Sequence, residues 1–312
     1  MKIKILITGG AGYIGSVLTQ RLLELDYTVT VYDNFFFDQT SLNHLCYNSK
    51  FSVIKGDVRD KKKIIPLLKK FDVIIPLAAL VGAPICKFDP VGARTINHDS
   101  VELLLKNITK NQIILMPTTN SAYGAGDKNN FCDEKTKLNP ISQYAKDKVD
   151  IEKKLMQRKN SISLRLATVF GMSPRMRVDL LVNDFVYRAV KDGFVVLFES
   201  HFKRNFIHIQ DACDAFIFCL NNFNLMKNQI FNVGLSDANL SKKQLCERIK
   251  KKLNNFVFFE EEITKDIDQR NYIVSNQKIE KLGFKTKISL EDGLDELIKG
   301  YHMLNVKKYS NF

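Results

Sequence analysis

Short apolar runs alternate with amphipathic stretches through the first half of the chain. The runs are rich in isoleucine and valine, which is typical of strands that are buried on both faces of a sheet. Strands joined by long amphipathic connections are expected to be parallel, because an antiparallel pair needs only a short turn. The pattern therefore predicts a parallel sheet with strands at 2–8, 28–32, 51–55, 73–77, 113–117 and 163–167.

The stretches between these runs carry apolar residues three and four positions apart, which is the spacing of one helix face. They predict helices at 13–25, 61–70, 91–109 and 142–158. Right-handed crossovers place such helices on both faces of the sheet. We therefore expect an α/β fold, a Rossmann-type doubly wound parallel sheet with a smaller mixed α/β domain appended to it.

The alternation loosens after Gly171. A helix at 211–221 and a strand at 230–233 are expected to rejoin the sheet, and the chain from Asn239 onward has a mostly helical pattern. At 312 residues the chain is long enough for two packed units. We expect a Rossmann domain at 1–170, joined again by 211–233, and a second domain at 171–210 and 234–312, with a cleft between them.

The composition argues against a membrane protein, a metalloprotein and a nucleic-acid-binding protein. Apolar residues make up 45% of the chain, and no stretch approaches the length of a membrane span or a signal-peptide core. The six cysteines are scattered, without C-x-x-C pairs or zinc-like histidine spacing, which favours a cytoplasmic location and no metal. The net charge of +13 is spread over separate predicted helices without a nucleic-acid-binding motif. We expect neither nucleic acid nor membrane as a partner.

A glycine-rich turn follows the first strand and opens the first helix. Gly9, Gly12 and Gly15 allow a tight turn and the close approach of a pyrophosphate to the helix N-terminus. Asp33 ends the second strand, where a carboxylate can bind both hydroxyls of an adenosine ribose. Residues 34–39 include no lysine or arginine for the 2′-phosphate of NADP, and Asp33 would repel that phosphate. The predicted cofactor is NAD.

Further cofactor contacts are expected where the third and fourth strands end. Asp57 and Val58 are placed to contact adenine, and the small side chains after Leu77 leave room for a dinucleotide. The predicted NAD-binding residues are Gly9, Gly12, Tyr13, Ile14, Gly15, Asp33, Asn34, Asp57, Val58, Leu77, Ala78 and Ala79, together with Tyr144 and Lys148.

A tyrosine and a lysine four residues apart follow the fifth strand. A helix places Tyr144 and Lys148 on one face, so the ammonium can stabilise a phenolate. An unperturbed tyrosine has a pKa of about 10 and is a poor base at neutral pH, but the ammonium and an oxidised nicotinamide both favour the phenolate. This pair predicts removal of a proton from an alcohol while NAD accepts the hydride.

Taken in order along the chain, these features resemble the extended short-chain dehydrogenase/reductase family of sugar-nucleotide enzymes. The resemblance also rests on Asn97, on Thr119 four residues before Tyr123-Gly124, and on Arg165 to Gly171. It implies that Tyr144 is the acid/base, that Lys148 lowers its pKa and holds the nicotinamide ribose, and that Thr119 binds the reacting hydroxyl.

The resemblance also implies a nucleotide-sugar substrate. Arg204 and Arg270 match the positions that hold the nucleotide diphosphate, and arginine suits this task because its planar fork can bind phosphate oxygens bidentately. Family members that dehydrate hexoses have Asp and Glu after the threonine, whereas this chain has Asn120 and Ser121, so elimination of water is not expected. The predicted substrate contacts are Val81, Ser121, Arg175, Arg177, Asn183, Arg204 and Arg270.

The segments 75–84 and 165–185 look like those of enzymes that oxidise C4 of GDP-D-glycero-D-manno-heptose in bacterial capsule biosynthesis. A GDP-linked sugar is therefore the favoured substrate, with a UDP-hexose 4-epimerase as the alternative. Thr168 stands where epimerases of the family usually have asparagine, which argues against the epimerase. A non-catalytic NAD-binding or nucleic-acid-associated protein is a further alternative. The family often dimerises through two helices per subunit, here 91–109 and 142–158, so we expect a homodimer.

Overall fold

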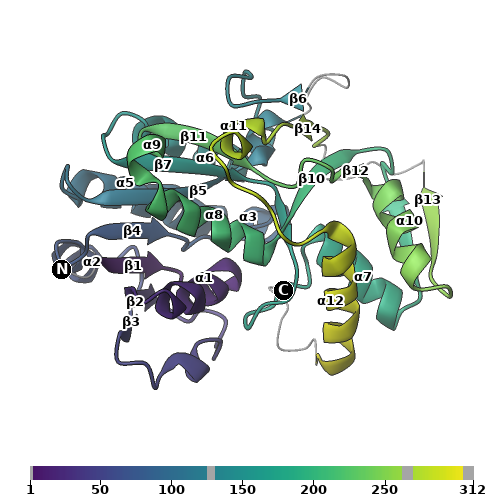
Figure 1. The fold of residues 1–312 in the computed structure, drawn as a ribbon, viewed down its shortest axis with the longest axis horizontal. Coiled ribbons are helices and arrows are strands. Elements are labelled where there is room, and N and C mark those ends of the chain that lie inside the picture. Colours follow the sequence, from purple (N-terminus) through teal and green to yellow (C-terminus); the bar gives the residue numbers. More distant parts are fainter. Residues whose placement is uncertain (1–2, 125–130, 262–269, 305–312) are drawn as a thin grey trace.

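The computed structural model describes residues 3–124, 131–261 and 270–304. Its centre is a parallel sheet of seven strands in the order β11-β7-β5-β4-β1-β2-β3, seen from the side in Figure 1. The predicted parallel sheet is confirmed. Its strands are β1 (Lys4–Thr8), β2 (Thr28–Asp33), β3 (Phe51–Lys55), β4 (Val73–Pro76), β5 (Ile113–Thr119), β7 (Ser161–Leu166) and β11 (Gln229–Val233).

Helices cover both faces of this sheet, because alternate side chains of each strand point in opposite directions. On β1, Ile5 and Ile7 pack into the core that contains Leu18 and Phe216, whereas Leu6 packs into a separate core on the other face. The helices of the first face are α1 (Tyr13–Glu24) and α8 (Ile209–Asn221). Those of the second face are α2 (Lys61–Leu68), α5 (Ser100–Asn107) and α6 (Gln143–Leu155).

The expected helix 91–109 is divided. It consists of α4 (Pro90–Arg94), the π-helical turn η2 (Thr95–Asp99) and α5. Within the turn, the Asn97 side chain is fully buried, where its amide accepts a hydrogen bond from Leu80 N at 2.8 Å and donates one to Leu80 O at 2.8 Å. The turn therefore ties the helix to the loop that follows β4, a tertiary contact that helical periodicity does not reveal.

Three small sheets lie beside the large one, and all but one of their strands come from the second half of the chain. In the first, β10 (Lys203–His208) lies between β8 (Thr168–Phe170) and β12 (Asn239–Ser241). Because β8 already pairs with β10, the strand pattern changes after β7, just before the expected domain limit at residue 170. The other two pair β9 (Phe194–Phe198) with β13 (Val257–Glu261) and β6 (Phe131–Cys132) with β14 (Ile273–Val274).

Helices pack around these small sheets, but the region after Asn239 is less helical than expected. Strands β12, β13 and β14 all lie there, because apolar residues such as Phe258 complete a sheet with the partner β9. None of the helices in the described residues is long and apolar enough to cross a bilayer. The remaining helices are η1 (Asn43–Leu45), α3 (Ala83–Phe88), η3 (Asn120–Tyr123), α7 (Leu181–Lys191), α9 (Phe223–Met226), α10 (Lys242–Lys252), α11 (Gln277–Glu280) and α12 (Leu290–Met303).

Candidate functional site

A cavity of about 710 Å³ lies where the strands of the large sheet reach their carboxyl ends. In open α/β sheets this edge is the usual place for a ligand, because loops from neighbouring strands meet there. The cavity is lined by every residue that the sequence predicted to contact cofactor or substrate, except Asn183. The structure thus brings together residues from Gly9 to Arg270 around one space.

The glycine turn leaves no room for side chains. Gly9 has φ +72°, and a Cβ built on it would lie 2.5 Å from the Ala78 backbone. A Cβ on Gly15 would lie 2.6 Å from Gly10 Cα, so helix α1 packs closely on the turn. Helix α1 begins at Tyr13, directly after the turn, and no side chain caps its first N–H groups. This geometry suits a pyrophosphate at a helix N-terminus.

Asp33 is held rigidly beside this turn. Its carboxylate accepts hydrogen bonds from Ala11 N at 3.0 Å and Phe35 N at 2.8 Å. Burial raises the pKa of Asp33, and these backbone hydrogen bonds oppose that rise. Because each carboxylate oxygen can accept more than one hydrogen bond, the group can still bind ribose hydroxyls.

The sequence did not reveal Arg59, which also lines the cavity. Its guanidinium donates to both oxygens of Asp57, from Nε at 2.8 Å and Nη2 at 2.6 Å, and it lowers the pKa of Asp57 to about 2. A cation near the adenosine end could favour a 2′-phosphate, but this one is already paired bidentately. The residues present fit a dinucleotide with a free ribose 2′-hydroxyl, as NAD has.

Helix α6 carries the predicted catalytic pair. Ser142 caps the helix, with Oγ accepting from Ala145 N at 3.2 Å, and Tyr144 follows in the first turn. Lys148 comes one turn later, and its Nζ lies 5.9 Å from the centre of the Tyr144 ring. Lys148 is buried, which lowers its pKa to about 8, and burial raises the pKa of Tyr144 to about 12.

The pKa of Tyr144 therefore depends on the positive charges around it. Arg270 and Arg177 each lower it, whereas Cys86 raises it. The protein alone leaves the phenol protonated at neutral pH, so the positive ring of an oxidised nicotinamide would add the stabilisation that a phenolate still needs.

Thr119 ends β5 and faces the same cavity. Its hydroxyl donates to the Ser121 hydroxyl at 2.9 Å, and Arg270 Nη1 donates to the same Ser121 Oγ. Arg270 thus lies close to the hydroxyls of Ser121 and Thr119, although the resemblance placed it at the diphosphate. The intervening Asn120 is fully buried and does not line the cavity.

Three further arginines line the side of the cavity formed by the second half of the chain. The Arg175 guanidinium stacks 4.8 Å from the Phe37 ring, and that of Arg204 lies 5.6 Å from the Tyr272 ring. Arg177 donates to Asp179 at 2.7 Å and to Val81 O at 2.9 Å, which fixes the Val81 carbonyl at the cavity wall. Buried and partnered in this way, the arginines form a rigid cationic wall.

Asn183 lies behind this wall. Its amide accepts from Gly171 N at 3.1 Å and donates to Arg177 O at 2.8 Å and Tyr13 Oη at 3.2 Å. The Tyr13 hydroxyl in turn donates to Gly171 O at 2.7 Å. Asn183, predicted as a substrate contact, is fully buried in this structure and links the glycine turn to the arginine segment.

Lys242 is a cavity residue that the sequence analysis missed. It is the first residue of α10, and its Nζ donates to Phe198 O at 2.6 Å and lies 5.7 Å from the Phe202 ring. It stands in a lysine-rich helix, where solvent exposure is the ordinary expectation, so no local signal distinguished it.

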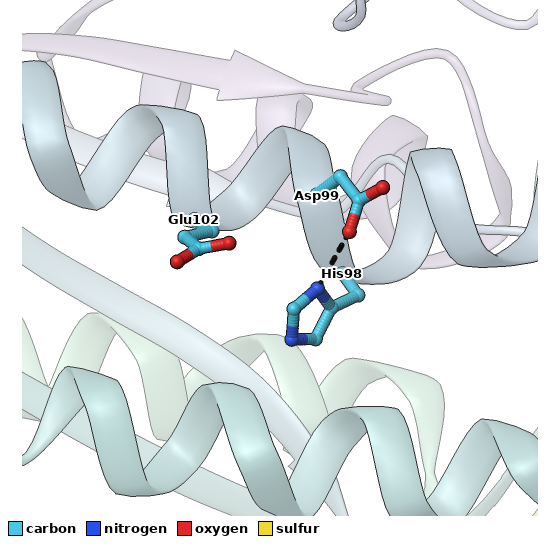
Figure 2. A group of neighbouring side chains, drawn as sticks. All are labelled: His98, Asp99 and Glu102. Carbon is cyan, nitrogen blue, oxygen red and sulfur yellow. Dashed lines mark hydrogen bonds and ion pairs between the residues drawn. The ribbon is translucent and has the colours of Figure 1, made fainter.

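A second cluster of titratable groups lies away from the cavity, where η2 and α5 face α6. Figure 2 shows His98, Asp99 and Glu102, whose ligand atoms are close enough together to hold a metal ion. Both His98 ring nitrogens already face carboxylates, however, Nδ1 at 2.7 Å from Asp99 and Nε2 at 2.6 Å from Asp150. We call the whole group the helix-pair ion cluster, which comprises Arg94, His98, Asp99, Glu102, Asp147, Asp150 and Lys154.

Comparison with known proteins agrees with this geometry. Residues 5–234 match the NAD dependent epimerase/dehydratase family. The chain belongs to this family. It is therefore an NAD-dependent enzyme, and the predicted NAD cofactor and extended short-chain dehydrogenase/reductase membership are confirmed.

Two curated relatives match the chain along most of its length. A putative UDP-glucose 4-epimerase from Methanocaldococcus jannaschii is 28% identical over 94% of this chain and 97% of its own. UDP-glucuronic acid decarboxylase 1 from Arabidopsis thaliana is 27% identical over 96% of this chain and 70% of its own.

Solved structures confirm the fold. UDP-glucuronic acid 4-epimerase from Bacillus cereus, in complex with UDP-glucuronic acid and NAD, has a TM-score of 0.85 at 24% identity, covering 97% of this chain and 100% of its own. UDP-glucose 4-epimerase from Thermotoga maritima has a TM-score of 0.82 at 24% identity, covering 96% of this chain and 99% of its own.

Proposed function

We propose that this family member oxidises the C4 hydroxyl of a nucleotide sugar and returns the hydride to the opposite face of the ketone, as a 4-epimerase. The observation that carries the proposal is the shared cavity. Thr119, Tyr144 and Lys148 line the same space as the glycine turn and Asp33. The named epimerase relatives, which act on UDP-sugars, support a hydride that returns to the sugar.

Bound NAD supplies the hydride acceptor in this reaction. The residues of the chain handle the proton: the Lys148 ammonium favours the phenolate of Tyr144, and the phenolate oxygen takes the proton from the C4 hydroxyl. The Thr119 hydroxyl orients the sugar hydroxyl, with its own position fixed by Ser121. Restoring the alcohol takes a hydride back at C4 and the proton back from Tyr144 at the ketone oxygen, and the face of the ring that receives the hydride sets the configuration at C4.

The same site argues against loss of water from the sugar. Elimination needs a positioned acid and base beyond the tyrosine. The positions after Thr119 are Asn120 and Ser121, neither of which carries a carboxylate, and Asn120 is buried outside the cavity. A dehydratase outcome is therefore not part of the proposal.

The cationic wall, formed by Arg175, Arg177 and Arg204, is where we expect the diphosphate of the nucleotide sugar to bind. A nucleotide diphosphate carries two negative charges, and the arginines of the second half of the chain provide fixed, planar donors for them. We infer that Arg204 and Arg175 contact phosphate, while Arg270 reaches the sugar because it already contacts Ser121. This division assigns substrate binding to the domain expected at 171–210 and 234–312.

A second candidate is oxidation without return of the hydride, with GDP-D-glycero-D-manno-heptose as the substrate. The observation that favours it is Thr168, which lines the cavity at the start of β8, where epimerases of the family usually have asparagine. Threonine has a shorter polar side chain than asparagine. It therefore offers a different contact to a bound keto sugar, which must rotate within the site before the hydride can return to its other face. The sequence resemblance of segments 75–84 and 165–185 also supports this candidate.

A substrate panel separates the two candidates. The purified protein, with NAD, is incubated with UDP-glucose, UDP-glucuronic acid, GDP-mannose and GDP-heptose, and the products are followed by NMR and mass spectrometry. A C4 epimer without accumulated NADH supports the first candidate, and a keto sugar formed with equimolar NADH supports the second. If no sugar nucleotide reacts, both are refuted.

The catalytic assignment has its own test. We expect Tyr144→Phe to lose turnover by about 10²–10⁴-fold while retaining NAD, because only the proton-transfer group is removed. Thr119→Ser keeps the hydroxyl and should keep most of the activity, whereas Thr119→Val should not. Near-normal turnover by Tyr144→Phe would refute the mechanism.

A further inference from the structure

Asp147 is a buried carboxylate that the proposed reaction does not use. It stands on α6 directly before Lys148, and both side chains are buried. Successive residues of a helix point about 100° apart, so Lys148 lines the cavity while Asp147 contacts Arg94 of α4. A charge in a poorly solvated position is costly unless other groups stabilise it. The carboxylate therefore needs partners, and the structure provides them.

Two donors hold the Asp147 carboxylate in place. Arg94 Nη1 donates to Oδ1 from α4, and Gln143 Nε2 donates to the same oxygen at 2.9 Å from the preceding turn of α6. Arg94 is held in turn by η2, where its Nε lies 3.4 Å from the Asp99 carboxylate and its Nη2 lies 3.3 Å from the His98 ring. The carboxylate is thus fixed on the side of α6 that faces α4.

The two members of this ion pair differ in exposure. The Arg94 side chain is 45% exposed, whereas the Asp147 side chain is 2% exposed. Solvent screens the charge of an exposed group, but a buried charge acts over several ångströms because the protein interior screens it weakly. Arg94 therefore cancels only part of the negative charge that Asp147 presents to its neighbours inside the protein.

Lys148 is the neighbour that this negative charge stabilises. Burial lowers the pKa of Lys148 to about 8, which leaves the ammonium only marginally stable near neutral pH. The Asp147 carboxylate opposes this fall, and the Cys86 thiol of α3 does so to a smaller extent. The charge on Lys148 therefore depends on the residue that precedes it.

The other charged groups around this part of α6 are screened or act on another residue. Arg177 and Arg270 act on Tyr144, whose pKa they lower. The side chains of Asp99 and Asp150, which flank the histidine of η2, are each about half exposed to solvent. Their influence on a buried ammonium is correspondingly weak.

We propose that Asp147 is a positioning residue for the reaction: its carboxylate keeps the Lys148 ammonium protonated, and the ion pair with Arg94 holds that carboxylate in place. This role rests on the proposed function, in which the Lys148 ammonium favours the phenolate of Tyr144. Asp147 does not line the cavity, so it acts on the proton transfer only through Lys148.

Titration of Lys148 tests the proposal without turnover of any substrate. Each protein is labelled with ¹³C at the lysine Cε atoms and saturated with NAD, and the Lys148 signal is the one absent from Lys148→Met. Asp147→Asn keeps an acceptor for Arg94 and Gln143 but removes the charge, so the midpoint of the Lys148 titration should fall by at least about one pH unit. Asp147→Glu restores the charge and should recover most of that shift.

Two controls separate charge from structure. Arg94→Gln breaks the same ion pair but leaves the buried negative charge, so it should not lower the Lys148 midpoint. Asp150→Asn removes a carboxylate from the same helix, two residues after Lys148, at a side chain that is 48% exposed. It should change the midpoint by less than about 0.3 unit, because solvent screens that charge. Circular dichroism and NAD binding show that each variant is folded.

The pH profile of turnover adds a readout that a purely structural role would not move. Lys148 is protonated at low pH in both the wild type and Asp147→Asn, so their kcat/KM values should agree there within about twofold. They should diverge to about fivefold as the pH rises through the wild-type midpoint, where a shift of one unit leaves far less ammonium in the variant.

Three results decide the matter. An Asp147→Asn midpoint within about 0.3 unit of the wild type overturns the proposal. A midpoint that falls as far in Arg94→Gln also overturns it, because the ion pair would then act through structure rather than charge. A midpoint that falls only in Asp147→Asn, in a protein that turns over no nucleotide sugar, supports the assignment of Asp147 to Lys148 while refuting the proposed function.

Discussion

The Lys148 ammonium lies 5.9 Å from the centre of the Tyr144 ring, one helical turn further along α6. Burial acts on the two groups in opposite senses, since it raises the pKa of Tyr144 to about 12 and lowers that of Lys148 to about 8. Both shifts follow from the cost of a charge in a poorly solvated site. Burial is the largest cause of both shifts, and it is opposed by Arg270 and Arg177 at Tyr144 and by Asp147 at Lys148.

This relationship predicts the pH dependence of catalysis. In the proposed reaction the base is the phenolate of Tyr144, so kcat/KM should rise with pH as the phenol loses its proton. Lys148→Met removes a cation that favours the phenolate, so the rising limb should move to higher pH by at least about one unit, and activity near neutral pH should fall about 10²-fold or more. Stopped-flow pH profiles of the two proteins measure this shift. Superimposable profiles would show that Lys148 does not tune Tyr144.

Asp33 should determine which dinucleotide binds. Asp33→Asn removes the negative charge that repels a 2′-phosphate and weakens hydrogen bonds to the ribose, so the Kd for NAD should rise about tenfold and preference over NADP should shrink. Isothermal titration with both dinucleotides measures the change. Asp38→Asn removes the same charge from an exposed position in the same loop and serves as the control. Equal effects of the two substitutions would count against a direct contact.

A buried ion pair joins helix α6 to the strands β5 and β7, close to Thr119. Arg165 binds Glu152 through Nη2 at 2.6 Å, and the hydroxyls of Thr118 and Ser163 also donate to Glu152. Glu152→Gln leaves the Arg165 charge buried without a counter-charge, which should cost about 3–5 kcal/mol of unfolding free energy. Urea denaturation measures the loss.

The matched control for that pair is exposed. Arg248 contacts Glu291 at 2.6 Å, and both side chains are more than two-fifths open to solvent. Glu291→Gln should change the unfolding free energy by less than about 1 kcal/mol, because solvent screens the pair. If Glu152→Gln and Glu291→Gln lowered the free energy of unfolding by similar amounts, burial would not be what makes the Arg165–Glu152 pair important.

Asn183 should matter for stability and only indirectly for catalysis. Asn183→Ala removes partners from Gly171 N, Arg177 O and the Tyr13 hydroxyl, and unmet buried polar groups of this kind cost about 2–4 kcal/mol together. Thermal unfolding measures the loss, with Asn222→Ala as the control at a partly buried asparagine that makes one such bond. If Asn183→Ala had normal stability but did not bind substrate, Asn183 would instead contact the substrate directly, as the sequence predicted.

The sequence predicted the parts of this site that follow from local pattern. Apolar runs placed the strands, and the glycine turn, Asp33 and Tyr144 were found because their chemistry depends on the ends of those strands. Local periodicity is a good guide there, since a buried parallel strand has few alternatives.

What the sequence did not predict depends on contacts between distant segments. Arg59 is paired with Asp57, so its charge is already balanced. The sequence alone would count Arg59 as a cation that could bind a phosphate. Lys242 lines the cavity because the packing of α10 places the first residue of that helix there. Strand β13 forms because β9 pairs with it. Such features depend on residues that are distant in the sequence, so a short stretch of the chain does not reveal them.

The π-helical turn η2 sets the rotational phase of two helices at once. Such a turn holds one residue more than regular α-helix, and each residue advances a helix by about 100°. Deleting one residue from 95–99 would make α4 and α5 continuous but rotate one against the other by that angle. Asn97 could then no longer face Leu80 while His98 faces Asp150. One inserted residue thus lets a single helical segment serve both the wall of the cavity and the packing of α6.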